Sequence, residues 1–538
     1  MSGVLADGGS FVLGLSEAGD NVILCRTARH QFMMVFGHFR GDRYYRCLLS
    51  SDSISSRPVS PDSAVLGVGQ MTDLLAGILK SFRGDFAGGI VTADDSDYDA
   101  VRAECVWNGD VDRRPWVIAR ARSADDVAAA IRLARESGRD LAVRGGGHNF
   151  SGSCIADDAV MIDLGALCDV SVDPLAKSAR CGGGTRWSQL DAATQVHGLA
   201  APGGFISHTG VAGLTLGGGM GWLSRKAGLS CDNLLSVEVV TAEGAIVRAS
   251  AEENRDLFWA VRGGGGNFGV VTEFEFRLHE VGPMVQLSLS FWDLDYGPQA
   301  FRAIRDQARD IPGDIAIFLA ALNAPPAPFV PEEHQGAPGY AVLLVDHGSP
   351  DAHSRAVDDL RRAAPPLFTF DTPIPYTALQ QMFDESAPWG FRGYEKAVYL
   401  DELTDEAIDV IARHFPLKAS PMSFMPLFVL GGKYAEPAEE DTAFGGSRRT
   451  LYALNIAAVA PTAELLEADR AWVRSFWTDL VPHAGGVASY VNFMSEFEED
   501  RVVASYGAEK YQRLSQIKAK YDPTNLFHLN ANIRPATA

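Results

Sequence analysis

The stretch that decides the fold of this chain is RGGGHNFSG, residues 144–152. Three consecutive glycines have no side chains to pack and are entropically costly to order, so such a run marks a place where backbone approaches a neighbour closely. The residues before it, 141–144 (LAVR), have the composition of a short buried strand. Loops at the carboxyl end of a strand are the usual ligand sites of α/β folds. His148 is therefore expected to face a bound ligand.

Upstream of this loop the pattern predicts a strand, a helix and a second strand. Residues 116–120 (WVIAR) form a short apolar run, and residues 124–137 have helical periodicity. Ser123 is a suitable N-cap with Asp126 three residues later, and Gly138 is a suitable end for the helix. The loop thus follows a βαβ-type start.

Two further glycine-dense segments follow, residues 202–222 (PGGFISHTGVAGLTLGGGMGW) and 262–269 (RGGGGNFG). Three such segments within about 125 residues indicate one extended ligand approached by bare backbone. A pyrophosphate fits, because successive N–H groups form an anion-binding nest without charged side chains. The sequence has no G-x-G-x-x-G in a Rossmann frame, and no P-loop, H-E-x-x-H or G-x-S-x-G motif, so these sites are not supported.

Bulk composition excludes several classes of partner. The 538 residues carry a formal net charge of -21, which disfavours nucleic acid and anionic membranes. No window approaches the roughly 20 apolar residues of a membrane-spanning helix, and the N-terminus lacks a secretory pattern, so we expect a cytoplasmic location. Seven cysteines without a C-x-x-C pair favour neither a disulfide framework nor a metal site.

Composition and residue patterning along the chain predict an α+β protein in four parts. Residues 1–67 mix clustered aromatics with a Ser/Pro-rich stretch and are expected to form a weakly ordered extension. Residues 68–281, with a core at 111–281, form the glycine-rich first domain. Residues 282–487 contain long β segments and intervening helices, typical of an α+β domain on a large antiparallel sheet. Residues 488–538 are expected to return to the first domain.

The histidine of the first loop suggests a chemical role. An imidazole beside a pyrophosphate nest can reach the far ring system of a dinucleotide folded across the domain. Its nitrogen is a competent nucleophile toward the methyl carbon of an isoalloxazine, so His148 is a candidate covalent tether.

Four segments in order, residues 144–152, 210–242, 262–276 and the C-terminal YVNF and YDPTNLFHLNANIRP, resemble one family. The resemblance is to the flavin-linked oxidases of the vanillyl-alcohol oxidase / p-cresol methylhydroxylase (PCMH) superfamily, in the bacterial berberine-bridge-enzyme-like branch that includes 6-hydroxynicotine and sugar oxidases. It runs from about Pro115 to Pro535 and implies a two-part PCMH-type FAD-binding domain plus the α+β substrate domain.

The resemblance implies FAD linked through the 8α carbon to His148. The other cofactor-binding positions that it implies are Arg144, Gly145, Gly146, Gly147, Asn149, Ser151, Gly204, Gly210, Gly213, Gly217, Gly218, Gly219, Asn267, Gly269, Val270, Val271, Asn530 and Asn532. Some members have a second bond from a cysteine, but Ile206 stands at that position, so a bond through His148 only is expected.

On the substrate side, Tyr490 and Asn492 are the catalytic candidates. Tyr394 and Lys396 are weaker pocket candidates, and His208 is expected near the flavin. Family sugar oxidases have tyrosines where this chain has Met220 and Phe493, which puts a phenolate base in doubt. An amine that binds in its neutral form would need no strong base.

The expected activity is removal of hydride from a C–H next to N or O of a small organic substrate. Dioxygen is the expected acceptor, giving hydrogen peroxide, and Thr209 is too small to block it. Three alternatives stay open: a flavin dehydrogenase with another acceptor, a reductase that uses NADPH, and a flavin-binding protein without catalysis. The sequence indicates neither the substrate nor an oligomeric state.

Overall fold

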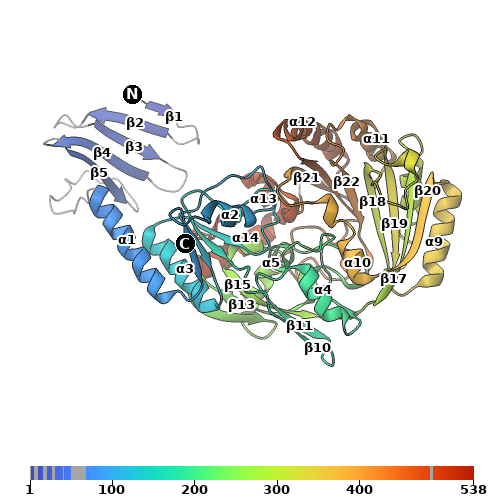
Figure 1. Cartoon of the computed structure of the whole chain (residues 1–538), viewed down its shortest axis with the longest axis horizontal. Coiled ribbons are helices and arrows are strands. Elements are labelled where there is room, and N and C mark those ends of the chain that lie inside the picture. Colours follow the sequence, from blue (N-terminus) through green and yellow to red (C-terminus); the bar gives the residue numbers. More distant parts are fainter. Residues whose placement is uncertain are drawn as a thin grey trace. The chain divides into compact units, whose positions relative to one another are not determined.

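The computed structural model describes residues 2–4, 10–15, 21–26, 31–39, 42–49, 68–484 and 489–537, with side chains from residue 75 onward in these ranges. The chain divides into two compact units, Met1–Gly84 and Asp85–Ala538, which are described separately (Figure 1). Among the described residues, no helix combines the length and apolar character that crossing a membrane requires.

In its described residues, the first unit contains five strands followed by a helix. The strands pair in chain order as an antiparallel meander: β1 (Ser2–Val4), β2 (Ser10–Leu15), β3 (Asn21–Arg26), β4 (Gln31–Phe39) and β5 (Asp42–Leu49). These strands are the segments described within residues 1–67, where the sequence predicts a weakly ordered extension. Consecutive apolar residues such as FMMVF hide the period-two alternation that marks a strand. Helix α1 (Val68–Asp85) falls almost wholly in this unit, not in the glycine-rich domain where its sequence position placed it.

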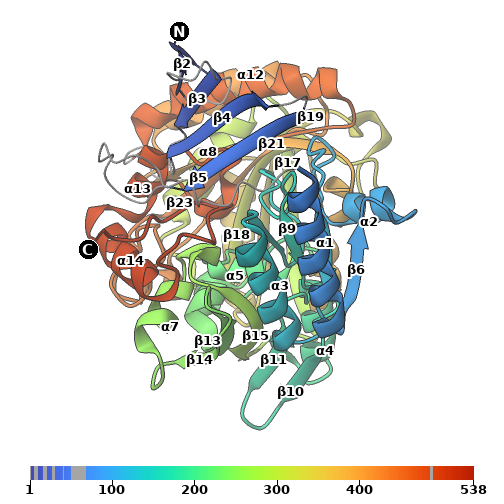
Figure 2. The same cartoon turned by 90° about the vertical axis from the view of Figure 1, so that its left-hand side faces the viewer.

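The second unit begins with a four-stranded sheet of order β6-β7-β9-β8. Its strands are β6 (Gly89–Thr92), β7 (Val117–Arg120), β8 (Leu141–Arg144) and β9 (Val160–Asp163), and the last three run parallel. Helix α2 (Tyr98–Glu104) follows β6, and α3 (Ala124–Ser137) lies beside β9 (Figure 2). The predicted βαβ start is confirmed: Ser123 Oγ accepts from the N–H of Asp126 at 3.1 Å, and Gly138 ends α3 at φ 65°.

A five-stranded antiparallel sheet completes the glycine-rich domain, in the order β10-β11-β15-β13-β14. Its strands are β10 (Val170–Asp173), β11 (Ser178–Gly182), β13 (Leu234–Val240), β14 (Ile246–Ser250) and β15 (Val270–Arg277). Strands β12 (Leu199–Ala200) and β16 (His279–Glu280) form a separate pair. The helices here are α4 (Trp187–Gln195), α5 (Val211–Leu216), α6 (Ser224–Ala227) and α7 (Arg255–Val261), with 3-10 turns η1 (Ser230–Asn233) and η2 (Gly265–Asn267).

A seven-stranded antiparallel sheet forms the other half of this unit, as predicted, in the order β20-β17-β19-β18-β22-β23-β21. Its strands are β17 (Met284–Trp292), β18 (Ile315–Asn323), β19 (Pro338–Asp346), β20 (Phe368–Pro375), β21 (Arg392–Leu400), β22 (Met425–Val429) and β23 (Tyr452–Ala460). Every second residue of a strand faces the same side. One side therefore packs on helices, and the other is free to line a cavity.

Four described helices cover one face of this sheet: α8 (Gly297–Gln307), α9 (Pro350–Ala363), α11 (Asp405–His414) and α12 (Ala463–Leu480). Figure 1 labels α9, α11 and α12, and Figure 2 labels α8. Thr404 and Thr462 cap α11 and α12 through side-chain hydrogen bonds. The remaining elements are α10 (Tyr376–Gln381) and the 3-10 turns η3 (Glu332–His334), η4 (Asp384–Ser386), η5 (Phe415–Leu417), η6 (Gly432–Ala435) and η7 (Val481–His483).

The C-terminal segment has hydrogen bonds to the glycine-rich half. It contains η8 (Val491–Phe493), α13 (Glu499–Tyr506) and α14 (Ala508–Tyr521). Asn267 donates from Nδ2 to the carbonyl of Ala531 at 3.1 Å and accepts from the N–H of Ile533 at 3.0 Å. Lys518 Nζ reaches the carbonyl of Asn267 at 2.6 Å.

Candidate functional site

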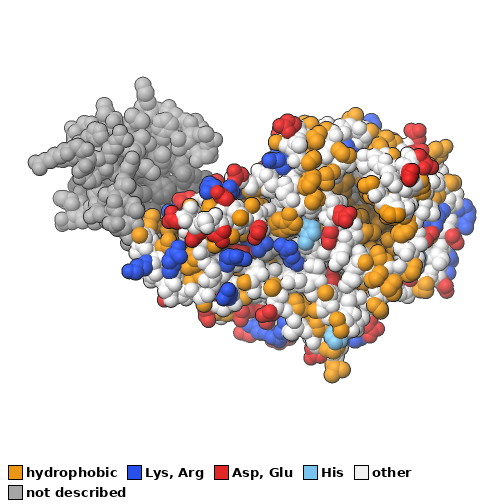
Figure 3. Space-filling view, in the orientation of Figure 1, with side chains coloured by type: hydrophobic (Ala, Val, Ile, Leu, Met, Phe, Trp, Pro, Cys, Tyr) orange, Lys and Arg blue, Asp and Glu red, His pale blue; other side chains and the backbone are white. Residues whose placement is uncertain are grey.

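A large cavity lies between the glycine loops and the free face of the seven-stranded sheet. Its volume is about 1170 Å³, which exceeds the roughly 300–1,000 Å³ of a site for one drug-sized ligand. Figure 3 shows a hollow in the second unit bordered by hydrophobic side chains. The cavity therefore has room for an extended ligand and a second molecule beside it.

The predicted cofactor positions divide into two groups. Thirteen line the cavity: Gly145, Gly146, Gly147, His148, Asn149, Gly204, Gly210, Gly213, Asn267, Gly269, Val270, Val271 and Asn530. Six do not: Arg144, Ser151, Gly217, Gly218, Gly219 and Asn532.

The first glycine loop is held by close backbone contact. A Cβ on Gly146 would stand 2.3 Å from the backbone nitrogen of Gly210, and a Cβ on Gly210 would stand 2.4 Å from that of Gly146. Gly147 adopts φ +70°, which favours glycine. Within the described chain, the N–H groups of residues 146–149 donate no hydrogen bond. They are available to an anion.

Arg144 anchors the strand end behind the loop. Its Nη1 donates to Asp163 Oδ1 at 2.7 Å, and both side chains are buried. The guanidinium is thus committed to the neighbouring strand and does not reach the cavity. The side chain of Arg144 therefore supports the loop from behind, while the expected contact of its backbone with the cofactor stays a prediction.

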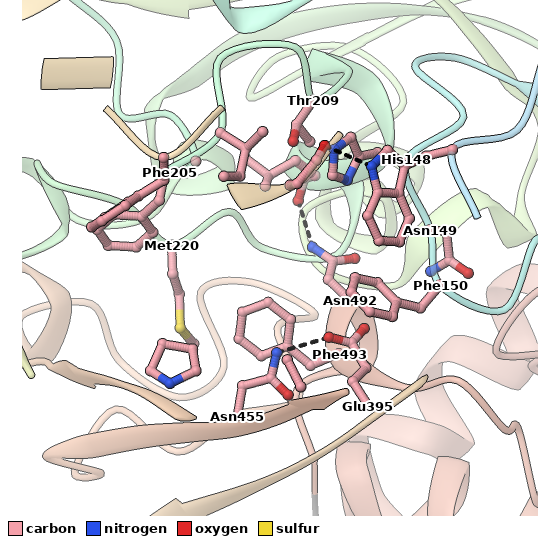
Figure 4. A pocket seen from close by; sticks show the side chains of 18 of the residues that line it. His148, Asn149, Phe150, Phe205, Thr209, Met220, Glu395, Asn455, Asn492 and Phe493 are labelled. Atoms are coloured by element: carbon pink, nitrogen blue, oxygen red, sulfur yellow. Dashed lines mark hydrogen bonds between the residues drawn. The ribbon is translucent and has the colours of Figure 1, made fainter. Parts of the chain in front are cut away.

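His148 faces the cavity within a group of rings. Its ring stacks on Trp107, with centroids 5.2 Å apart at 20°. Nε2 lies 3.1 Å from Nδ1 of His208. Figure 4 shows His148 in the wall of the cavity. His208 was expected near the flavin, and it lies beside the histidine expected to bear it.

Both histidines are neutral at pH 7. Burial, with a smaller effect of His208, lowers the pKa of His148 to about 3. Burial also lowers the pKa of His208, against the opposing effect of Asp384. One neutral ring can donate to the other. In the tautomer in which Nε2 of His148 is the donor, Nδ1 of His148 keeps a free lone pair.

The second and third glycine segments supply backbone to the cavity. Gly213 lies on α5, and a Cβ added there would meet no atom within 4 Å. Open space at a helical glycine that lines the cavity indicates where a ligand would lie against the backbone. Gly269, at φ +152°, is instead enclosed by Val239 and Val240.

The C-terminal asparagines also present unused polar atoms. Oδ1 of Asn530 and Oδ1 of Asn532 are buried and have no hydrogen-bond partner in the described chain. An unpaired buried acceptor is costly, so such atoms indicate a missing donor. Asn530 lines the cavity, whereas Asn532 lies outside its wall.

Tyr490 and Asn492 line the cavity but are committed to neighbouring backbone. The Tyr490 hydroxyl accepts from the N–H of Gly219 at 2.7 Å and from Asn492 Nδ2 at 2.8 Å. Asn492 Nδ2 also donates to the carbonyl of Leu214 at 2.9 Å. Burial raises the pKa of Tyr490 above its usual value. These bonds support the turn at 217–219 and use the acceptor side of the Tyr490 hydroxyl. The catalytic role expected for both residues stays a prediction.

The predicted pocket residues on β21 are on the wrong face. Tyr394 Oη lies 3.0 Å from Glu496 Oε2, and Lys396 Nζ donates to the same oxygen at 3.2 Å; neither residue lines the cavity. The residue between them, Glu395, does, and it is 3% exposed. Glu395 was not among the predicted site residues, although strand alternation gives 394 and 396 one face and 395 the other.

Glu395 forms a pair with Asn455 on the adjacent strand β23. Asn455 Nδ2 donates to Glu395 Oε2 at 2.7 Å (Figure 4). Burial raises the pKa of Glu395 to about 8, and the hydrogen bond from Asn455 opposes the rise. Such a carboxyl changes protonation state near neutral pH, as a general base or acid must.

Met220 and Phe493, at which the sequence departs from family sugar oxidases, line the cavity. Ile206, at the position of a second flavin bond, and Thr209, expected to leave access for oxygen, line it too. Cys154 is the cavity-lining cysteine of the described chain, and burial raises its pKa to about 11, so it is a thiol at neutral pH.

Comparisons with known proteins agree with this architecture. Residues 115–250 match the family model of an FAD binding domain, and residues 489–534 match that of berberine and berberine-like proteins. The chain is 30% identical over 464 residues to (R)-6-hydroxynicotine oxidase of Paenarthrobacter nicotinovorans, which covers 83% of this chain and 97% of that protein.

Two solved structures share the fold. The crystal structure of 6-hydroxy-D-nicotine oxidase from Arthrobacter nicotinovorans has a TM-score of 0.73 at 27% identity, covering 84% of this chain and 98% of that one. Glucooligosaccharide oxidase from Acremonium strictum, whose FAD is linked to a cysteine and a histidine, has a TM-score of 0.74 at 22% identity, covering 87% and 100%.

Proposed function

We propose, because this chain belongs to the berberine-bridge-enzyme-like FAD-linked oxidoreductases, that it is an oxidase carrying FAD on His148 and acting on a small organic alcohol or amine. The observation that carries the proposal is the shared cavity. A nest of free N–H groups with His148 lies in one part of its wall, and the buried Glu395 lies in another.

The residues present fit FAD. No lysine or arginine of the described chain lines the cavity, so a pyrophosphate must be bound by backbone. The free N–H groups at 146–149 can do this, and Gly210 gives them room. Asn530 Oδ1 can accept from a donor of the cofactor, and the open side of Gly213 can receive a flat ring.

A single covalent bond through His148 agrees with the residues nearby. The position of a second, cysteinyl bond is occupied by Ile206, and Cys154 is held as a protonated thiol. If Nε2 of His148 donates to Nδ1 of His208, then Nδ1 of His148 holds the free lone pair. His208 then acts as a positioning residue for attachment of the cofactor.

Replacing His208 by alanine is expected to leave FAD bound but to lower the covalently attached fraction at least tenfold. The imidazole of His148 would lose the partner that fixes its tautomer and orientation. Flavin in the pellet and in the supernatant after acid precipitation gives the two fractions. His208→Asn keeps an acceptor near the position of Nδ1 and should restore most of the attachment. Full attachment in His208→Ala would remove His208 from this step.

FAD, when bound, supplies the acceptor for the hydride of the substrate carbon. The chain supplies the proton acceptor. Glu395, in its ionised form, takes the proton of a substrate hydroxyl or ammonium group as the hydride leaves the adjacent carbon. Asn455 holds the carboxylate through its 2.7 Å hydrogen bond. This replaces the idea that the substrate needs no strong base.

Which molecule accepts electrons from the reduced flavin can be tested without knowing the substrate. Reducing the flavin with dithionite under anaerobic conditions and mixing with aerated buffer should give rapid reoxidation with one hydrogen peroxide per flavin. Slow reoxidation, with rapid electron transfer to a quinone, would support a dehydrogenase instead. A flavin that no alcohol or amine reduces would support a binding protein without catalysis.

A further inference from the structure

The cavity face of the seven-stranded sheet has a channel that the proposed chemistry does not use. We propose that the substrate is a long, largely apolar molecule whose tail lies in this channel and whose reacting alcohol or amine group lies at Glu395 and Asn455. This inference rests on the proposed function, and it names the substrate class of the same site.

The floor of the channel is a row of small side chains that crosses the sheet. Pro426 stands beside Asn455, since Leu427 pairs with Leu454 on the next strand. Pro426 pairs with Ala320, and Ala320 pairs with Ala341. These strands lie about 4.8 Å apart, so the floor extends roughly 14 Å from Asn455 to Ala341.

The neighbouring row is made of large side chains. Phe428 pairs with Phe318, Phe318 with Leu343, and Leu343 with Leu289. All of these residues line the cavity. A row of small residues beside a row of large ones forms a trough with an apolar wall.

The channel ends at a pair of stacked rings. Ala341 pairs with Phe291, and the rings of Phe291 and Phe368 stack with centroids 4.9 Å apart at 15°. Phe291 lies on β17, five strands away from Glu395 on β21. This end wall limits the length of the tail that fits in the channel.

The chemistry of the lining selects the ligand class. Among the residues that the strands of this sheet contribute to the cavity, the polar ones are Glu395, Asn455 and Asn323, and Glu395 and Asn455 adjoin the start of the channel. The absence of lysine and arginine from the described lining disfavours an anion. An oligosaccharide would leave many hydroxyls without partners on this floor. A hydrocarbon chain or fused rings would gain from burial along it.

The test is a series of 4-alkylbenzyl alcohols, from ethyl to octyl, titrated by calorimetry into the anaerobic holoenzyme whose flavin has first been reduced with dithionite, so that binding occurs without oxidation of the alcohol. We expect Kd to fall by up to about fourfold for each added methylene until the chain reaches Phe291, and then to level off. Ala320→Phe should make the affinity level off at a shorter chain, and Ala341→Phe at an intermediate one. Ala363→Phe, exposed at the end of α9 on the far side of the sheet, is the matched control and should follow the wild type.

Two results would overturn the inference: a Kd that does not change with chain length, or the same levelling point in Ala320→Phe and in the wild type. Cellobiose binding more tightly than the octyl compound would also overturn it. Failure of the proposed function can be told apart from failure of this inference. In that case Kd would still depend on chain length, but none of the alcohols would reduce the oxidised flavin. If either phenylalanine variant does not fold, the other carries the comparison.

Discussion

Replacing Glu395 by glutamine is expected to lower kcat/KM by about 10²- to 10⁴-fold, the range for losing a general base. The exchange keeps the size of the side chain and can still accept from Asn455, so the cavity should keep its shape. The measurement is steady-state oxidation of the most rapidly turned-over alcohol of the alkylbenzyl series, followed through hydrogen peroxide.

The dependence on pH distinguishes a base from a merely structural residue. Because the pKa of Glu395 is raised to about 8, the active carboxylate form is scarce at pH 6 and dominant above pH 9. Activity should therefore rise with pH through about 8, and this limb should be lost in Glu395→Gln. Asn455→Ala removes the hydrogen bond that lowers the pKa of Glu395. In this variant the rise of activity should therefore occur at higher pH. If Glu395→Gln keeps the wild-type kcat/KM and the rise of activity through about pH 8, Glu395 is not the base.

Replacing Gly146 by alanine is expected to abolish FAD binding, leaving a colourless protein. The new methyl group would stand 2.3 Å from the backbone nitrogen of Gly210, and neither backbone can yield without separating the two loops. Overpacking of this kind costs about 1–3 kcal/mol of folding free energy. Flavin content of the purified protein and its thermal unfolding measure the two effects.

Gly213→Ala is the matched control. Its methyl group would meet no protein atom within 4 Å, and alanine is favoured over glycine in a helix by roughly 0.5–1 kcal/mol. The apoprotein should therefore be as stable as the wild type or more so, while FAD binding weakens because the methyl group projects into the cavity. Normal flavin content in Gly146→Ala would show that contact between the two loops is not needed.

The sequence predicts the glycine-rich half well because its signals are local. The cap at Ser123, the glycine at 138 and the apolar runs around them each depend on a few neighbouring residues. The large antiparallel sheet was predicted for the same reason, since its strands are long and regular. The order of those strands depends on contacts between distant segments and was not predicted.

Side-chain direction was harder to predict. In GYEKAVYL, alternation separates Tyr394 and Lys396 from Glu395 but does not tell which face meets the cavity, and α12 covers the face that the tyrosine and the lysine share. Arg144 and Tyr490 show a second difficulty. Both lie in family motifs, yet their polar atoms are used by Asp163 and by the N–H of Gly219. Such partners are visible only once the chain is folded.

The most direct test of the account is acid precipitation of the purified wild type and of His148→Ala. If His148 bears the cofactor, flavin absorbance remains with the precipitated wild-type chain and passes into the supernatant with the variant. If the flavin of the wild type is released by acid, or that of His148→Ala is retained, the assignment of His148 as the point of attachment is wrong.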